Sequence, residues 1–342
     1  MRVAVPDRPA TIRLEDRPIP VIGPGELLVR VSGCGLCGSD LLKLMSPAPS
    51  GTLGHEVVGW VVKIGEGLSG FREGDRVIVA HHVPCFACHY CRRGSPTMCR
   101  AFKASNLDPG GFAEYVRVPT PNVRFATFVL PPNLPDDVAA FTEPLACCLR
   151  AVKRSRVEAG DSVVVVGLGS IGLMMIQLFR QLGLQVVAIE PRADRRALAV
   201  RFGLSRTFAP DNPALPEEVG AVSQGRGADI VMVTVGAPSA IGQAWTLLRD
   251  GGMLHLFAGP EGEGAPTVPT GQLYHRELTV TATYSAAPAD LSEAFDLLSS
   301  GAVNVRELVT HRLPLSRIQE GIDLFLRHEA LKVLITANGD GV

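Results

Sequence analysis

The sequence predicts an α/β protein with a doubly wound parallel sheet and a separate β-rich part. From Asp161 onward, apolar strand-like segments alternate with helix-like segments, the pattern of a parallel sheet with crossover helices. The first 130 residues hold short β-like segments separated by glycine and proline. A length of 342 residues with 46% hydrophobic residues allows about two domains, each with its own core.

In the N-terminal part, the β-like segments are rich in β-branched residues and bounded by turn residues. They are Leu27–Val31, Val57–Ile64, Arg76–Ala80 and Phe112–Val118. Their shortness and spacing predict a small β domain that carries long loops. The composition becomes helical over Asp136–Ala151, which marks the passage to the second part of the chain.

In the second part, strands and helices are expected to follow one another in regular order. The expected strands are Ser162–Val166, Gln185–Glu190, Ile230–Val235 and Met253–Ala258, and the expected helices are Ile171–Leu182, Ala193–Phe202 and Ala240–Leu248. The last sixty residues again mix the two types, at Thr279–Thr283, Leu291–Ser299 and Val333–Thr336. From pattern alone this last segment could belong to either part.

The composition argues against several classes of partner. A net charge of −1 gives no electrostatic basis for binding nucleic acid or an anionic membrane. Residues 1–20 carry charges and prolines instead of the apolar core of a signal peptide. The longest uncharged run, 162–179, contains several glycines and is interpreted as a strand, a turn and a helix. We therefore expect a cytoplasmic protein whose partner is a small molecule.

The segment Gly167-Leu168-Gly169-Ser170-Ile171-Gly172 matches the dinucleotide-binding pattern G-x-G-x-x-G. It follows a valine-rich strand and opens an apolar helix, which is the context that the pattern requires. The first glycine allows the tight turn, the second lets the backbone approach a pyrophosphate, and the third lets helix and strand pack closely. Gly167, Gly169, Ser170, Ile171 and Gly172 are therefore candidate cofactor-binding residues, with N–H groups directed at the phosphates.

Glu190 ends the next expected strand, about twenty residues after the glycines. A carboxylate at this point can bind the adenosine ribose hydroxyls, and it would repel a 2′-phosphate, so NAD is favoured over NADP. Arg192 argues for NADP instead, because an arginine near this point can bind the 2′-phosphate.

Four of the eight cysteines form one local group, with the spacing Cys85-x2-Cys88-x2-Cys91-x7-Cys99. Four thiolates close a tetrahedral site with no open position, as in structural zinc sites. An iron–sulfur cluster uses similar first spacings, but its usual fourth cysteine follows after three residues and precedes proline. Here Arg100 follows Cys99. Four unliganded thiols would also be unusual in so polar a loop, so zinc is favoured.

A second set of potential metal ligands is dispersed along the chain. It comprises Cys37, His55, Glu56 and Glu143, and each of these residues alone could be structural. Together they offer one thiolate, one imidazole and carboxylates, a set that can hold catalytic zinc with three protein ligands and one open position. Asp40 could accept the remaining ring N–H of His55 and fix its tautomer. The spacing does not show that these fragments meet in space.

These motifs together resemble the zinc-containing medium-chain dehydrogenase/reductase family. The resemblance runs over nearly the whole chain and rests on Cys37-Gly38-Ser39-Asp40, Gly54-His55-Glu56, the four-cysteine loop, Thr142-Glu143-Pro144-Leu145, the glycine pattern and Glu190. The Glu-Pro-Leu setting of Glu143 is similar to the polyol (sorbitol) and threonine dehydrogenase branch, whereas primary alcohol dehydrogenases usually have cysteine there.

The resemblance implies a GroES-like β-barrel catalytic domain of residues 1–150 and 286–342 and a Rossmann domain of residues 151–285. It implies two zinc ions, one structural and one catalytic. Cys37, His55 and either Glu143 or Glu56 would hold the catalytic ion, and Arg195 would lie beside the adenine. It also implies a homodimer or homotetramer, because members of this family commonly pair through the sheet edges of their cofactor domains.

The chain departs from this branch at two places. Leu42 stands where relatives usually carry a proton-relay histidine, and the loop between Asp40 and Gly54 is short. Proton exit is then expected through Ser39, the cofactor ribose and water, or through another group. His81 and His82 follow an expected strand, and the sequence favours positions facing solvent for both.

The expected function is reversible hydride transfer between a secondary alcohol, of polyol, sugar-alcohol or cyclitol type, and NAD. Zinc would act as a Lewis acid on the substrate oxygen. Two alternatives stay open: an NADP-dependent carbonyl reductase, and a zinc-loop binding protein with a Rossmann sensor and no catalysis. A titration that compares NADH with NADPH distinguishes the carbonyl reductase from the NAD-dependent dehydrogenase. The number of zinc ions per chain distinguishes the binding protein from the enzyme.

Overall fold

The computed structural model describes residues 1–259 and 268–337. It divides the chain into two compact units. Unit 1 comprises Met1–Ala146 and Ala286–Val342, and unit 2 comprises Cys147–Ser285. Among the described residues, no helix is both long and apolar enough to span a bilayer.

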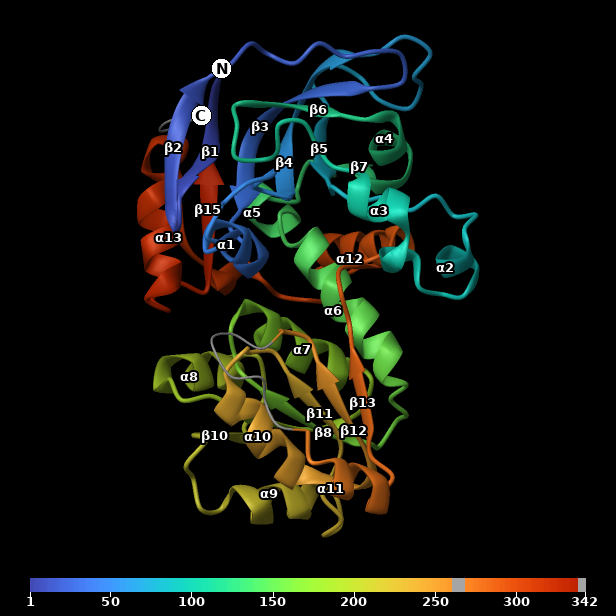
Figure 1. Cartoon of the computed structure of the whole chain (residues 1–342), viewed down its shortest axis with the longest axis vertical. Coiled ribbons are helices and arrows are strands. Elements are labelled where there is room, and N and C mark those ends of the chain that lie inside the picture. Colours follow the sequence, from blue (N-terminus) through green and yellow to red (C-terminus); the bar gives the residue numbers. More distant parts are fainter. Residues whose placement is uncertain (260–267, 338–342) are drawn as a thin grey trace. The chain divides into compact units, whose positions relative to one another are not determined.

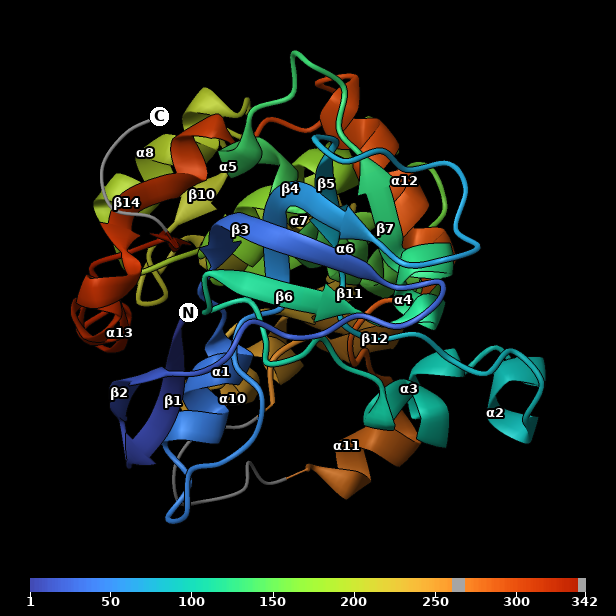
Figure 2. The ribbon, with the colours of Figure 1, turned by 90° about the horizontal axis from the view of Figure 1, so that it is seen from above.

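Unit 1 is built around one sheet with the strand order β14-β15-β3-β4-β5-β7, and β6 also pairs with β3. Figure 2 shows β6 alongside β3. The β1–β2 hairpin forms a separate two-stranded sheet. The strands are β1 (Arg2–Arg8), β2 (Thr11–Asp16), β3 (Leu27–Gly35), β4 (Glu56–Ile64), β5 (Arg76–Val79), β6 (Tyr115–Val118), β7 (Thr127–Val129), β14 (Val309–Pro314) and β15 (Lys332–Thr336).

The helices of unit 1 are mostly short and lie in the connections between strands. They are α1 (Gly38–Leu44), α2 (His89–Arg92), α3 (Arg100–Ala104), α4 (Thr120–Ala126), α5 (Asp136–Ala139), α12 (Pro288–Ser299) and α13 (Ile318–Leu326). Helix α6 (Thr142–Ser155) begins in unit 1 and ends in unit 2. The core of unit 1 joins apolar residues of β3, β4, β5 and β6 to those of β15 and α13. The C-terminal segment thus completes the core begun by the first strands.

Unit 2 contains a six-stranded parallel sheet with the order β10-β9-β8-β11-β12-β13. Figure 1 labels β8, β10, β11, β12 and β13 of this sheet. Its strands are β8 (Ser162–Val166), β9 (Gln185–Ile189), β10 (Thr207–Phe208), β11 (Ala228–Val233), β12 (Leu248–Leu256) and β13 (Thr279–Ala282). Its helices are α7 (Ser170–Gln181), α8 (Ala193–Arg201), α9 (Leu215–Val222), α10 (Pro238–Leu247) and α11 (Thr270–His275). The doubly wound sheet predicted from the sequence is confirmed.

The valine run of β8 shows why this sheet needs helices on both faces. Successive strand residues point to opposite faces, and all five residues of β8 are buried. Val164 and Val166 belong to a core that includes residues of α9 and α10. Val163 and Val165 point to the opposite face, where α7 packs against β8 and β9. This sheet order also brings the carboxyl ends of β8 and β9 side by side, next to the glycine turn.

Candidate functional site

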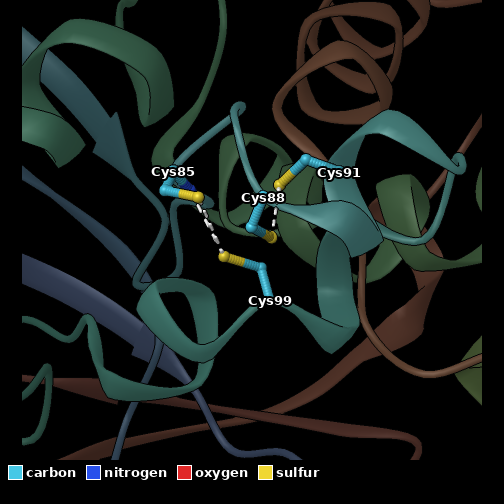
Figure 3. A group of neighbouring side chains, drawn as sticks. All are labelled: Cys85, Cys88, Cys91 and Cys99. Carbon is cyan, nitrogen blue, oxygen red and sulfur yellow. Dashed lines mark hydrogen bonds between the residues drawn. The ribbon is translucent and has the colours of Figure 1, made fainter.

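The four clustered cysteines of unit 1 meet in the loop that follows β5 (Figure 3). Cys85 precedes α2, Cys88 caps it, Cys91 lies in it and Cys99 precedes α3. The Sγ atoms of Cys85 and Cys99 are 3.5 Å apart, and those of Cys88 and Cys91 are 3.6 Å apart. Both separations are far longer than a disulfide bond of about 2.05 Å.

This geometry fits a tetrahedral zinc ion. All four sulfur atoms lie within 4.8 Å of one another, and sulfurs bound to one zinc at about 2.3 Å would be separated by about 3.8 Å. Burial disfavours a charged thiol at Cys99, but hydrogen bonds from the backbone of Cys85 and Phe102 outweigh it and lower the pKa of Cys99 to about 6, whereas burial and the other three thiols raise the pKa of Cys91 to about 12. A thiolate at neutral pH is the form that binds a metal.

The dispersed set also meets in unit 1. One ligand atom each of Cys37, His55 and Glu56 lies within 4.8 Å of the others. Cys37 caps the N-terminus of α1, and Glu56 is the first residue of β4, directly after His55. A thiolate sulfur, an imidazole nitrogen and a carboxylate oxygen form a donor set that suits zinc and leaves a fourth position open. The residues present therefore fit a catalytic metal.

Asp40 ties these ligands together. Its Oδ2 accepts a hydrogen bond from the Cys37 N–H at 3.2 Å, and its Oδ1 accepts one from the Gly54 N–H at 3.0 Å. The same Oδ1 lies 3.4 Å from Nδ1 of His55, which leaves Nε2 of His55 for a metal. Burial alone would lower the pKa of His55, but the Asp40 carboxylate and the Cys37 side chain outweigh it and raise that pKa well above its usual value.

Glu56 is held by a residue that the sequence analysis missed. Nζ of Lys332, at the start of β15, lies 2.7 and 2.8 Å from the two carboxylate oxygens of Glu56. Both side chains are buried, and Lys332 also donates to the Leu36 carbonyl at 3.3 Å. Gly35 faces Glu56 across the β3–β4 pair, and a Cβ at Gly35 would lie 1.8 Å from a Glu56 oxygen. A glycine at this position leaves room for the carboxylate.

Glu143 is buried at the start of α6 but does not belong to the group of three ligand atoms. Glu143 lies close enough to Lys332 to affect its pKa. Burial would lower the pKa of Lys332, but Glu56, then Cys37 and Glu143, raise it above its usual value. Lys332 is therefore charged and lies among potential metal ligands.

Two residues named in the sequence analysis lie on α1. Oγ of Ser39 is 3.4 Å from Nε2 of His55, on the side of the ring that is available to a metal. Leu42 is two-thirds exposed, so it replaces a potential relay group by an apolar side chain at the surface of unit 1.

The expectation of solvent-facing histidines after β5 was wrong for His81. Its side chain is buried, and its ring centre lies 4.6 Å from that of His55. The chain turns inward here because Ala80 donates its N–H to the Ala126 carbonyl and accepts a hydrogen bond from the Asn122 amide. His82 is partly buried and packs against His81, at 3.7 Å between ring centres.

In unit 2, the glycine turn has the geometry that a pyrophosphate needs. Gly167 has φ +97°, and a Cβ at Gly172 would lie 2.0 Å from the Gly167 carbonyl oxygen. A Cβ at Gly169 would meet no atom of the described chain within 4 Å, so this side of the turn is open to a ligand. Ser170 and Ile171 open α7, whose first N–H groups point toward the same turn.

Glu190 follows β9 and is buried beside this turn. Its carboxylate accepts hydrogen bonds from the N–H groups of Leu168 at 2.8 Å and Arg192 at 3.0 Å. Nη1 of Arg195 lies 4.0 Å from the same carboxylate. The Arg192 guanidinium forms an ion pair with Asp194 at 2.8 Å. Glu190 therefore supports the glycine turn as well as placing negative charge beside it.

Comparison with known proteins gives one consistent result. A model described as an alcohol dehydrogenase GroES-like domain matches residues 23–126, and one described as a zinc-binding dehydrogenase matches residues 170–300. The chain is 32% identical to an L-threonine 3-dehydrogenase of Caldanaerobacter subterraneus subsp. tengcongensis, over 93% of each chain. It is 33% identical to a sorbitol dehydrogenase of Halalkalibacterium halodurans, over 94% of this chain and 95% of the relative.

Among solved structures, a zinc-binding dehydrogenase of Sinorhizobium meliloti with bound NADP superposes with a TM-score of 0.87. It is 30% identical to this chain, and the match covers 98% of each. The galactitol-1-phosphate dehydrogenase of Escherichia coli superposes with a TM-score of 0.84 at 28% identity, over 98% of this chain and 100% of that one.

Proposed function

Because this chain belongs to the zinc-containing medium-chain dehydrogenase/reductase family, in its polyol and threonine dehydrogenase branch, we propose that it oxidises a small secondary alcohol to a ketone, reversibly, with NAD as hydride acceptor. One observation carries this proposal: Cys37 and the adjacent pair His55 and Glu56, which stand well apart from Cys37 in the sequence, present their ligand atoms within 4.8 Å of one another. The relatives named above are dehydrogenases, which favours catalysis over a purely binding role.

The residues of this site have separate roles in binding the metal, orienting its ligands and moving the proton. When bound, zinc supplies Lewis-acid polarisation of the substrate oxygen, and the oxidised nicotinamide supplies the hydride acceptor. Cys37, Nε2 of His55 and Glu56 would hold the metal, while Asp40 orients the imidazole from its other nitrogen. Oγ of Ser39, 3.4 Å from Nε2 of His55, would accept the proton that leaves the substrate hydroxyl while its own proton passes toward the cofactor ribose and water.

Glu56 rather than Glu143 is the carboxylate proposed to bind the metal directly. Its oxygen already lies with the other two ligand atoms. A carboxylate has about four lone-pair sites, so Glu56 can keep its contact with Lys332 while it binds a cation. Glu143 then contributes negative charge to the surroundings of Lys332.

The proposed cofactor is NAD, bound by Gly167, Gly169, Ser170, Ile171 and Gly172. The buried Glu190 carboxylate would repel a 2′-phosphate, and Arg192 is already paired with Asp194. The second zinc is proposed at Cys85, Cys88, Cys91 and Cys99, where it would stabilise the loop. We also propose that the protein is cytoplasmic, because a reducing compartment keeps clustered thiols available for metal. By analogy with the family, we propose that it forms a homodimer or homotetramer.

The test is the Cys37→Ala variant, with Cys34→Ala as matched control. Cys34 is a buried cysteine of β3 outside the ligand group. We expect Cys37→Ala to abolish turnover while NADH binding, followed by fluorescence, is retained, and Cys34→Ala to keep turnover. Unchanged turnover in Cys37→Ala would reject the metal role. Titration with NADH and NADPH separates the NAD-dependent dehydrogenase from an NADP-dependent carbonyl reductase.

A further inference from the structure

The peptide unit that joins Gly167 to Leu168, directly after β8, is held at both ends by side chains from neighbouring segments. Its carbonyl oxygen, on Gly167, accepts a hydrogen bond from the Thr234 hydroxyl at 3.0 Å. Its N–H, on Leu168, donates to Oε2 of Glu190 at 2.8 Å. Because a peptide unit is planar, two bonds at its opposite ends fix the rotation of the whole plane.

The sheet order explains how two residues distant in sequence reach one peptide. Strands β9 and β11 flank β8 on its two sides. Glu190 directly follows β9. Val233, the last residue of β11, pairs with Val166, the last residue of β8, so Thr234 and Gly167 leave the sheet side by side. The glycine turn is therefore held between the carboxyl ends of the two strands next to β8.

The Thr234 hydroxyl matters for the Gly167 carbonyl in particular. It also lies 3.0 Å from the Val166 carbonyl, but that carbonyl already accepts the Thr234 backbone N–H at 2.9 Å. Among the described residues, no other hydrogen bond to the Gly167 carbonyl is present. This oxygen faces α7, since a Cβ at Gly172 would lie 2.0 Å from it. Without the hydroxyl, the carbonyl would have no donor in its present orientation.

The orientation of this peptide decides where the next N–H groups point. The N–H groups of Gly169, Ser170 and Ile171, at the start of α7, have no acceptor among the residues that the structure describes. They are the groups left to bind a pyrophosphate. The Leu168 N–H is not available, because Glu190 accepts it. Rotation of the peptide that precedes these groups would change their direction.

We propose that Thr234 is a positioning residue of the cofactor site, whose hydroxyl holds the glycine turn in the form that receives the pyrophosphate. The inference rests on the proposed function, in which this turn binds a dinucleotide. Thr234 acts through the Gly167–Leu168 peptide and not by contact with the phosphates. Glu190 has the complementary role at the N–H end of the same peptide.

The same two strands are also bridged by a hydroxyl at their other ends, which supplies a matched control. Oγ of Ser162, the first residue of β8, donates to Oδ2 of Asp229 at 2.7 Å and accepts the Asp229 N–H at 3.1 Å. Asp229 lies near the start of β11. Ser162→Ala therefore removes a hydroxyl bridge between β8 and β11 at the end of the strands opposite the glycine turn.

The test measures the binding of NADH, ADP-ribose and adenosine to the zinc-loaded enzyme. NADH is followed by its fluorescence, and the other two by displacement of NADH; NADH and ADP-ribose contain the pyrophosphate, whereas adenosine does not. Thr234→Val replaces the hydroxyl by a methyl group, Thr234→Ser keeps it, and Thr234→Ala takes the place of the valine variant if that one does not fold. KM for NAD, kcat with an alcohol that the wild type oxidises, and the melting temperature are measured for every variant.

We expect Thr234→Val to raise the dissociation constants of NADH and ADP-ribose by about threefold to tenfold, the range that corresponds to one neutral hydrogen bond. KM for NAD should rise by the same factor, while kcat at saturating NAD does not fall and adenosine binds as before. Thr234→Ser should bind NADH as the wild type does. Ser162→Ala should lower the melting temperature and leave all three dissociation constants unchanged.

The inference and the proposed function fail in different ways. If Thr234→Val, or Thr234→Ala in its place, binds NADH and ADP-ribose as the wild type does, Thr234 does not position the turn, although the proposed function stands. The same conclusion follows if adenosine binding weakens as much as NADH binding. If the wild type binds neither NADH nor ADP-ribose, the proposed function fails, and the role of Thr234 fails with it.

Discussion

Replacing Lys332 by methionine removes one partner of a buried ion pair and keeps the length of the side chain. The pair joins Nζ of Lys332 to both oxygens of Glu56 at 2.7 and 2.8 Å, with side-chain exposures of 6% and 1%. The variant leaves the Glu56 carboxylate buried without its cation. Breaking a buried pair in this way destabilises proteins by about 3–5 kcal/mol.

Bound zinc should reduce the loss of stability in Lys332→Met. A zinc ion at the Cys37, His55 and Glu56 site supplies positive charge beside the same carboxylate, so the loss should be smaller in the zinc-loaded protein than in the metal-free protein. The free energy of unfolding of metal-free Lys332→Met should therefore fall by about 3–5 kcal/mol, and zinc should restore part of it. By linkage, the variant should bind zinc at this site more tightly.

The assay is equilibrium denaturation followed by tryptophan fluorescence. The chain has two tryptophans, Trp60 in β4 of unit 1 and Trp245 in α10 of unit 2, so a Trp245→Phe background isolates the signal of unit 1. The free energy of unfolding of the double variant Glu56→Gln/Lys332→Met should fall by less than the sum of the decreases in the two single variants, because neither buried charge remains. An exposed ion pair contributes at most about 1 kcal/mol. A difference of about 1 kcal/mol or less between the free energies of unfolding of metal-free Lys332→Met and its parent would therefore refute the reasoning.

Three further predictions concern other parts of the chain. Gly172→Ala should weaken NADH binding and lower the melting temperature, because its Cβ meets the Gly167 carbonyl at 2.0 Å; Gly169→Ala should weaken binding without loss of stability, because its Cβ meets nothing. Cys91→Ser should release one zinc per chain, measured by mass spectrometry, and lower the melting temperature of unit 1. Burial lowers the pKa of His255 from 6.5 to about 4; the unfolded chain therefore binds the extra proton, and stability should fall by about 3 kcal/mol as the pH drops from 6.5 to 4, a slope that His255→Asn should reduce.

The parts of the fold that could be predicted are those coded by local pattern. The valine run of β8 and the glycine turn after it were located to within a residue, because a strand buried on both faces and a tight turn each have a local signature. The four-cysteine loop was also recognised from spacing alone, and its sulfur atoms do meet. Local sequence carries this information because the interacting residues are close in the chain.

The parts that could not be predicted depend on pairing between distant segments. Lys332 meets Glu56 only because β15 pairs with β3, which in turn pairs with β4. The available signal was a single lysine at the start of a continuous apolar strand, which alone does not indicate its partner. The burial of His81 likewise depends on how the chain turns after β5 against α4.

The most direct test of the central claim is a crystal structure of the protein loaded with zinc, with data collected on both sides of the zinc absorption edge. The proposal predicts two anomalous peaks per chain. One should lie among the four cysteine sulfurs, and the other at about 2.0–2.3 Å from Cys37, Nε2 of His55 and a Glu56 oxygen. A single peak at the four-cysteine loop, in crystals whose protein turns over alcohols, would contradict it.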